Sequence, residues 1–219
     1  MEKYFDILLK TPLFSGVEAQ ELSALLGCMQ ARVISVTKGS PVFLEGDPAG
    51  FMGVVLSGAV QIVRDDYYGN RSMLAHAETG QLFGETYACS NTEKMPVSGY
   101  AVRDCEILWL SCRKMLTVCS NACRFHNQIV TNLLQVVAEK NRELSQKIRF
   151  MSQKTTREKL MAYLSDQAKK AGSASFTIPF DRQALADYLG VERSAMSAEL
   201  SKLRDGGILT AKGAHFTLL

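Results

Sequence analysis

The chain has 219 residues, of which 47% are hydrophobic and 21% charged, so it can form one or two domains with buried cores and is not intrinsically disordered. No run of about 18 apolar residues occurs, which excludes an ordinary membrane-spanning helix. The net charge is only +3, but residues 148–219 carry 11 Lys and Arg against 7 Asp and Glu, whereas residues 1–147 carry 14 against 15. A basic terminal region on a near-neutral body is typical of nucleic-acid-binding proteins.

The first residues and the cysteines indicate a cytoplasmic protein. Met1 to Asp6 lack the basic segment and apolar run of a signal peptide. Scattered cysteines without an export signal favour reduced thiols, and we expect most of them to be small buried hydrophobic residues. Cys119 and Cys123, which are separated by three residues, have the alternative of forming a thiol pair. The six cysteines are Cys28, Cys89, Cys105, Cys112, Cys119 and Cys123.

From Arg32 to Leu110, short β-prone segments alternate with glycine-containing turns. Many short strands with turns at about eight to twelve residues predict an antiparallel barrel or sandwich. A helix over residues 17–29, with leucines on one face, is expected before it. The expected strands are residues 32–37, 41–44, 52–56, 59–63, 72–76, 100–102 and 106–110.

A long helix follows, because residues 125–148 contain no Gly or Pro. Its apolar stripe needs a covering partner, which could be an antiparallel helix, a symmetric twin helix or the chain's own barrel. We favour the twin, since a small barrel cannot cover the whole stripe, and predict a dimerisation helix over residues 122–148. The seam residues are Ile129, Val130, Leu133, Val136, Val137 and Leu144.

The last third predicts a helix-turn-helix. A basic amphipathic helix over 156–170 and a strand at 176–178 come first. Asp181 can then cap a helix whose Leu185, Ala186 and Leu189 face inward, and Gly190 suits the turn. Val191, Met196, Leu200 and Leu203 form the inner face of the second helix. Its exposed N-terminal part would be the segment that enters a major groove: Arg193, Ser194, Ser197 and Ala198.

Residues 208–218 predict a β-hairpin that turns at Lys212-Gly213, and a helix-turn-helix followed by a hairpin is a winged module. One alternative is a two-helix packing motif without DNA binding. Another is a small-molecule sensor whose C-terminal domain contacts a protein partner. The wing, the basic charge and the long helix together favour DNA binding.

Several motifs now resemble those of the cyclic-AMP receptor protein / fumarate-nitrate reductase regulator family of bacterial transcription factors, along nearly the whole chain. They are Lys38-Gly39, Phe43, Glu45-Gly46-Asp47-Pro48, Gly58, Gly80 and Phe83-Gly84-Glu85. The resemblance implies an α+β protein with an N-terminal β-roll of the cyclic-nucleotide-binding jelly-roll type. The implied domains are the effector-sensing roll at 1–121, the dimerisation helix at 122–148 and the winged helix-turn-helix at 149–219.

The resemblance also implies an effector pocket, and here the sequence departs from the family. Gly84 and Glu85 match the ribose-binding pair, but Met95-Pro96, before Val97, stand where cyclic-nucleotide binders have Arg-Ser. Losing a guanidinium removes the charge-assisted contact to a phosphate, and proline has no N–H. Lys140 and Asn141 replace the hydroxyls that contact adenine. We therefore expect that cyclic AMP does not bind; Glu85 could equally brace the roll.

Other branches of the family carry iron–sulfur clusters or haem. The cluster needs four thiolates, and only Cys28 lies in the N-terminal region. His76 and His126 have no evident second axial ligand, so we interpret them as structural. We expect no metal and a small uncharged or carboxylate-bearing organic effector near Glu85, Met95, Lys140 and Asn141. Lys140 would be its counter-ion, with the alternative that it is a solvated residue of the helix seam.

Carrying the family's DNA contacts onto this chain gives Arg193, Ser194 and Ala198 at the base-reading positions. Arg193 keeps the geometry that reads guanine, while the other two differ from the family, so the operator should differ as well. Ser197 serves either bases or backbone. The remaining candidates for backbone contacts are Arg182, Gln183, Lys202 and Lys212.

The leading hypothesis is a homodimeric, effector-responsive regulator that binds an inverted repeat in double-stranded DNA and contacts RNA polymerase. An enzyme is not expected, because no phosphate-binding loop, metal-ligand cluster or nucleophile elbow occurs in the sequence.

Overall fold

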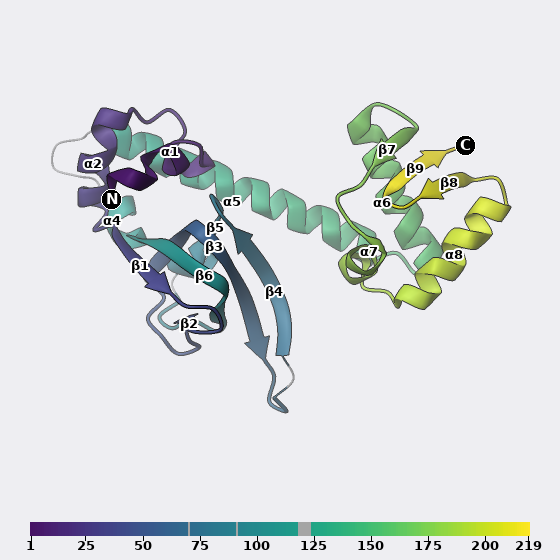
Figure 1. The fold of residues 1–219 in the computed structure, drawn as a ribbon, viewed down its shortest axis with the longest axis horizontal. Coiled ribbons are helices and arrows are strands. Elements are labelled where there is room, and N and C mark those ends of the chain that lie inside the picture. Colours follow the sequence, from purple (N-terminus) through teal and green to yellow (C-terminus); the bar gives the residue numbers. More distant parts are fainter. Residues whose placement is uncertain (70, 91, 118–123) are drawn as a thin grey trace. The chain divides into compact units, whose positions relative to one another are not determined.

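The computed structural model (Figure 1) describes residues 1–69, 71–90, 92–117 and 124–219. The predicted thiol pair Cys119 and Cys123 lies outside them. The chain divides into two compact units, Met1–Ala138 and Glu139–Leu219, and the division falls within the long helix α5 (Arg124–Met151). We describe each unit by itself.

The first unit begins with helices of which the sequence predicted only α2. Tyr4, Leu8, Leu13 and Phe14 bury their side chains together with the leucines of α2. These short elements come before the first strand and join the same core as the start of α5. They are η1 (Glu2–Tyr4), α1 (Phe5–Leu8), η2 (Pro12–Phe14) and α2 (Ala19–Cys28).

Among the described residues, an antiparallel sheet of six strands, two small helices and the first part of α5 complete the first unit. β6 pairs with β1, β2 and β3, and β3 also pairs with β4 and β5. The predicted α+β class with an N-terminal β-roll is confirmed. Its elements are β1 (Arg32–Val36), β2 (Pro41–Phe43), β3 (Phe51–Asp65), β4 (Arg71–Glu78), β5 (Leu82–Phe83), α3 (Glu85–Ala88), β6 (Ser98–Ser111) and α4 (Cys112–Leu116).

Two long strands replace four predicted short ones. The expected strands 52–56 and 59–63 are both part of β3, and 100–102 and 106–110 are both part of β6. The predicted turn at Gly58 is a bulge inside β3, where the pairing with β6 shifts register. Gly58 has φ +85°, and a Cβ there would lie 2.4 Å from the carbonyl oxygen of Asp104. Glycine therefore lets two strands pass closely rather than reversing the chain.

The interior of the roll is apolar and largely aromatic. The rings of Phe43 and Phe83 stack with centroids 6.2 Å apart, and the Trp109 ring meets Phe83 edge-on at 5.5 Å. Val55, Val60 and Ile107 fill the space around them. A second core lies between the sheet and the N-terminal helices.

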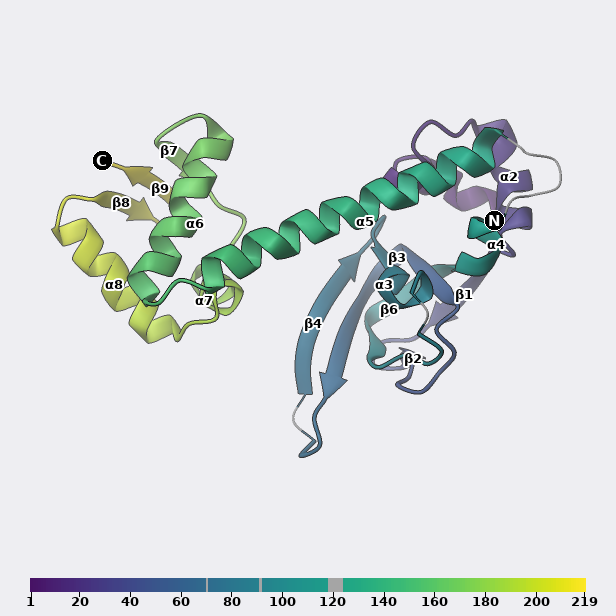
Figure 2. The same cartoon turned by 180° about the vertical axis from the view of Figure 1, so that it is seen from behind.

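The second unit has the predicted winged helix-turn-helix. Thr155 and Glu158 form a reciprocal capping box at the start of α6 (Thr156–Ala171). Two helices follow, α7 (Arg182–Leu189) and α8 (Arg193–Asp205). A three-stranded sheet in the order β7-β9-β8 completes the unit (Figure 2). Its strands are β7 (Ser175–Thr177), β8 (Leu209–Lys212) and β9 (His215–Leu218).

Helix α5 requires a correction to the predicted seam. Ile129 and Leu133 are buried in the core of the first unit, and Val136 packs against it. Asn132, also buried, donates hydrogen bonds to the carbonyl oxygens of Leu13 and Ser15, both at 2.8 Å. Ile129, Leu133 and Val136 therefore pack against their own domain, which was the alternative to a twin helix. The N-terminal helices cover this part of the apolar stripe, which the sheet alone would not.

No helix in the described part of the chain is long and apolar enough to cross a lipid bilayer.

Candidate nucleic-acid interface and effector site

The geometry of the helix-turn-helix follows from its two ends. The Asp181 carboxylate accepts a hydrogen bond from the backbone N–H of Ala184 at 2.8 Å, which caps α7. Gly190 ends that helix with φ +61°, in the left-handed region that glycine adopts without strain. Lys159 of α6 donates to the Gly190 carbonyl oxygen at 3.4 Å. The turn between the helices is thereby held from both sides.

Helix α8 has the two faces that the sequence predicted. Met196, Leu200 and Leu203 are buried against Leu185, Ala186 and Leu189 of α7 in the core of this unit. The opposite face, near the N-terminus of α8, is exposed. It carries Arg193, Ser194, Ser197 and Ala198.

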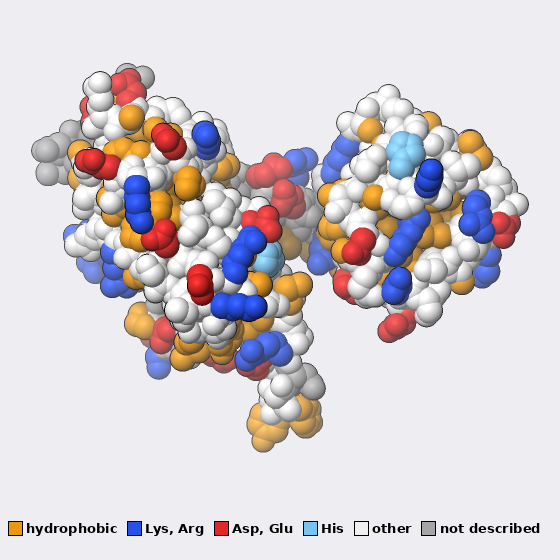
Figure 3. Space-filling model, viewed as in Figure 1, with side chains coloured by type: hydrophobic (Ala, Val, Ile, Leu, Met, Phe, Trp, Pro, Cys, Tyr) orange, Lys and Arg blue, Asp and Glu red, His pale blue; other side chains and the backbone are white. Residues whose placement is uncertain are grey.

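The charges on α8 are not equally available to a ligand. Lys202 is paired with Glu199 at 2.6 Å, and Arg204 lies 3.3 Å from Asp205. In the described chain Arg193 makes no such ion pair, and it stands at the first turn of the helix. The face of the second unit in Figure 3 presents several Lys and Arg side chains among fewer acidic ones.

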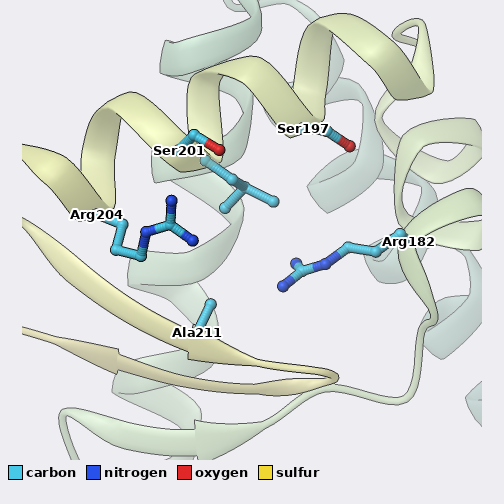
Figure 4. A pocket seen from close by; sticks show the side chains of 6 residues that line it. Arg182, Ser197, Ser201, Arg204 and Ala211 are labelled. Atoms are coloured by element: carbon cyan, nitrogen blue, oxygen red, sulfur yellow. The ribbon is translucent and has the colours of Figure 1, made fainter.

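A cavity of about 150 Å³ lies beside α8, between the helix and the wing. Figure 4 shows the guanidinium groups of Arg182 and Arg204 reaching into it from different elements, with Ser197 and Ser201 along one wall. Arg182 is half-buried, its guanidinium 4.8 Å from the centre of the Phe216 ring. Burial lowers the pKa of Arg182, although the group stays charged at neutral pH.

Two residues of this cavity, Ser201 and Arg204, were missed by the sequence reasoning. They share one face of α8 with Ser197, at spacings of four and then three residues. Extending the predicted exposed face by two turns would have found them. Arginine forks and serine hydroxyls are the groups that hold phosphate oxygens, so the cavity is suited to an anion.

The remaining predicted contacts lie on the same unit. Gln183 is exposed and donates to Asp187 within α7 at 2.9 Å, and Lys212 is exposed at the end of β8, in the wing. Neither is buried or committed to the core. Both remain available for contacts outside the unit.

In the first unit, Gly84 and Glu85 form the start of α3. Gly84 has φ +78° and lies at the N-cap, and the Glu85 side chain is buried with 4% exposure. A buried carboxylate at this position suits either predicted role, binding an effector or bracing the roll.

Met95 and Val97 lie in the interior of the roll, and Pro96 between them is half-buried. Met95 and Val97 are buried in the aromatic core with Phe43 and Trp109. The N–H of Met95 already donates to the carbonyl oxygen of Asp47 at 2.7 Å, and proline has no N–H. This segment therefore offers a phosphate neither a guanidinium nor, at its first two residues, a backbone donor.

The other predicted pocket residues, Lys140 and Asn141, belong to α5 in the second unit. His126 is buried and its Nε2 donates to the Met115 carbonyl oxygen at 2.6 Å, while His76 lies 3.7 Å from Glu78 on β4. Both histidines thus have protein partners. Among the described residues, no group of three His, Cys, Asp or Glu side chains could hold a metal ion.

Comparisons with known proteins match both units. Residues 33–122 match the cyclic nucleotide-binding domain and residues 158–219 the Crp-like helix-turn-helix domain. The cyclic AMP receptor protein of Thermus thermophilus is 27% identical over 91% of this chain and 88% of its own length. The transcriptional activator protein anr of Pseudomonas aeruginosa is 21% identical over 83% of this chain and 74% of its own.

A solved structure of CLP, a c-di-GMP responsive global regulator of Xanthomonas campestris, has the same fold with a TM-score of 0.59. It is 20% identical in sequence and covers 92% of this chain and 99% of its own. Both domains of the present chain, in the same order, thus occur together in proteins named as regulators.

Proposed function

Because this chain belongs to the cyclic-AMP receptor protein / fumarate-nitrate reductase regulator family, and is a DNA-binding transcription regulator with an effector-binding domain, we propose that it acts as a homodimer on an inverted repeat. The two half-sites would lie about one helical turn apart, as two-fold symmetry requires. We place this action in the cytoplasm, with RNA polymerase as the second partner.

The observation that carries the proposal is the exposed N-terminal face of α8. Arg193 stands there without an ion pair to any described residue, on a helix whose other face is buried. An arginine at this position can donate two hydrogen bonds to the O6 and N7 atoms of guanine in the major groove. Ser194, Ser197 and Ala198 beside it are too short to reproduce the Glu and second Arg of familiar members, so we expect a different half-site.

The cavity beside α8 supports the backbone contacts. Arg182 and Arg204 direct two guanidinium groups toward one hollow. A DNA phosphate entering there would receive charge-assisted hydrogen bonds from both sides, which fixes the register of the helix without reading sequence. Gln183, Lys202 and Lys212 would add contacts around it.

Dimerisation is supported by a stripe along α5 that the monomer leaves exposed. Leu134, Leu144 and Ile148 are 68%, 60% and 66% exposed. The stripe advances by alternating steps of four and three residues, the repeat of a coiled coil, with Asn141 as its polar member. We therefore propose Asn141 as a seam residue that fixes register, in addition to the effector role implied by the family. The stripe consists of Val130, Leu134, Val137, Asn141, Leu144, Ile148 and Met151.

The effector is proposed to be a small organic molecule other than cyclic AMP. The apolar burial of Met95 and the missing N–H of Pro96 support this. The relatives also differ in what their names state, cyclic AMP in one and c-di-GMP in another, so the fold alone does not define the ligand. Native mass spectrometry of the purified protein and titration with cyclic AMP test this part. Retained cyclic AMP, or saturable binding of it, would contradict the proposal.

Selection from a pool of randomised DNA duplexes tests the proposed function directly. We expect enrichment of an inverted repeat, with binding that weakens steeply as salt increases. Arg193→Ala should cost about 1–3 kcal/mol of binding free energy and relax the preference at one base pair of each half-site. Lys212→Ala is the matched control: it should weaken all sequences equally and reduce the salt dependence by about one counterion.

The absence of duplex binding at low salt, with and without cell-extract metabolites, would refute a DNA-binding role. Selected sites without two-fold symmetry would refute the homodimer on an inverted repeat.

A further inference from the structure

Two cysteines far apart in the sequence meet in the first unit. Cys89 follows α3, and Cys112 is the first residue of α4, which packs beside α3 (Figure 2). Their sulfur atoms lie 3.1 Å apart. A disulfide joins its sulfurs at about 2.0 Å, so each sulfur would need to move by roughly half an ångström.

The two thiols differ in accessibility. Cys89 is exposed, whereas Cys112 is 1% exposed and belongs to the core beneath the N-terminal helices. An oxidant in solution can therefore reach Cys89, while Cys112 is covered by the core. An exposed attacking thiol beside a covered resolving thiol is the arrangement of a redox-active pair.

They also differ in acidity. The hydrogen bond from Cys112 lowers the pKa of Cys89, although burial and the nearby Glu85 carboxylate oppose the effect. The same hydrogen bond, together with burial, raises the pKa of Cys112. Of the two thiols, Cys89 is thus the more acidic, and it more readily forms the thiolate needed for nucleophilic attack.

We propose that Cys89 and Cys112 are a modification site, at which a disulfide-type oxidant converts the thiol pair into a reversible intramolecular disulfide. The Cys89 thiolate attacks one sulfur of the oxidant RSSR and displaces RS⁻, which leaves a mixed disulfide on Cys89. Cys112 then loses its proton and attacks the Cys89 sulfur, displacing the second RS⁻. Two cysteine thiols are oxidised and one RSSR is reduced to two RSH, which accounts for both electrons and both protons.

The bond would connect two functional segments. The candidate effector residues Gly84 and Glu85 are the N-cap and the first residue of α3. The last turn of α4 contacts α5 through the hydrogen bond between His126 and Met115. Linking α3 to α4 therefore restrains the segment between the candidate effector site and the long helix. An effect on DNA affinity rests on the proposed function, whereas formation of the bond does not.

The chain provides its own control thiols. Cys28 is exposed at the end of α2, and burial raises the pKa of Cys105. An oxidant can reach Cys28, but this thiol does not have the sulfur contact that Cys89 has. Cys105 is buried, so an oxidant cannot reach it. Among the cysteines that the structure describes, only Cys89 is both exposed and in contact with the sulfur of another cysteine, Cys112.

Peptide mapping after oxidation tests the site. The full-length protein and its Cys119→Ser/Cys123→Ser variant are incubated with glutathione disulfide, blocked with N-ethylmaleimide and digested with trypsin. Cys89 lies on peptide 72–94, and Cys105 and Cys112 both lie on peptide 104–113. We expect these two peptides to be linked in both proteins, with fragment ions that place the bond on Cys112, and to separate after treatment with dithiothreitol.

Single variants provide the matched controls. Cys89→Ser changes an exposed residue and should abolish the linked peptide, while Cys28→Ser should retain it. In the reduced protein, N-ethylmaleimide should modify Cys89 several-fold faster than Cys28. A stable glutathione adduct on Cys89 without linkage, a bond to Cys105, or a bond between two chains would each overturn the proposal.

A second measurement compares the affinities of oxidised and reduced protein for the selected duplex. We expect a change of at least about fivefold, the lower end of allosteric coupling, and no change in Cys89→Ser. Equal affinities despite a formed disulfide would overturn the regulatory consequence. Failure of both forms to bind any duplex would instead overturn the proposed function and leave the modification site standing.

Discussion

The two units place their candidate sites differently with respect to their apolar cores. In the second unit, Arg193 and its neighbours lie on the outer face of a helix whose inner face completes the core. In the first unit, Glu85, Met95 and Val97 are all buried, and the last two are part of the aromatic core itself. A surface site can change its residues without repacking, whereas a site inside a roll changes together with the core around it. We therefore expect substitutions at the DNA-facing site to cost little stability, whereas substitutions at Met95 or Val97 also disturb the core.

The largest expected effect tests whether the second unit is held by its own core. Leu203 is fully buried on the inner face of α8. Leu203→Ala should destabilise this unit by about 2–5 kcal/mol, because the cavity left behind only partly collapses. Calorimetry should show the transition of the second unit shifted downward and that of the first unit unchanged. Ser194→Ala, on the exposed face of the same helix, is the control, and a shift of both transitions by Leu203→Ala would contradict the independence of the units.

A second substitution tests the close approach of β3 and β6 in the first unit. Gly58→Ala combines a positive φ with a Cβ 2.4 Å from the carbonyl oxygen of Asp104, so we expect a loss of about 2–4 kcal/mol. Gly39 has nearly the same φ, +81°, but nothing within 4 Å of its Cβ position. Gly39→Ala should therefore cost only about 1–2 kcal/mol. Chemical denaturation of both variants measures the difference, and equal losses would show that the close approach of the strands costs nothing.

Gly58 also shows how far the sequence could predict this fold. The pattern of short apolar segments correctly predicted a β-roll, but it read Gly58 as the corner between two strands. Whether a glycine turns the chain or forms a bulge depends on what its Cα approaches, and Asp104 is 46 residues away in the sequence. Local periodicity contains no information about that approach.

The same limit of local sequence patterns applies to the exposed face of α8 and to the cavity beside it. The exposed face of α8 follows from helical spacing alone, so Arg193, Ser194, Ser197 and Ala198 could be predicted. The cavity beside α8 is lined by residues of α8, by Arg182 of α7 and by Ala211 of the wing. Spacing within one helix cannot show that these elements come together. Likewise, Ile129 and Leu133 were assigned to a dimer seam because the apolar core supplied by Leu13 and Phe14 had no recognisable pattern.

A third substitution concerns the exposed stripe of α5, which belongs to the core of neither unit. Leu144→Lys should raise the dimer dissociation constant by at least about tenfold, because it places a charge in each copy of the seam. The monomer should be barely destabilised, since Leu144 is 60% exposed. Sedimentation equilibrium measures the dissociation constant, with Glu143→Lys on the neighbouring exposed position as the control. An unchanged dimer in Leu144→Lys would mean that the copies associate through another surface.

The smallest expected effect concerns acid stability of the second unit. Burial opposes ionisation of Asp166, but hydrogen bonds from Lys170 and Arg149 outweigh it and hold the pKa of the carboxyl group below its usual value of 3.8. A carboxyl group with a lowered folded-state pKa contributes stability that is present above its unfolded pKa and is lost as the pH falls through the folded one. Both cations are about half exposed, so the contribution should remain below about 1 kcal/mol.

Asp166→Asn should remove this contribution, giving a smaller loss of stability between neutral pH and acid than the wild type shows. Glu139→Gln breaks the pair with Arg142, in which both partners are more than half exposed, whereas the Asp166 side chain is only 15% exposed. It should leave that loss nearly unchanged, because solvent already screens the pair. Thermal unfolding of the three proteins between neutral pH and about pH 3 measures the comparison, and a loss in Asp166→Asn equal to that of the wild type would show that the bridge from α5 to α6 contributes nothing to holding the second unit.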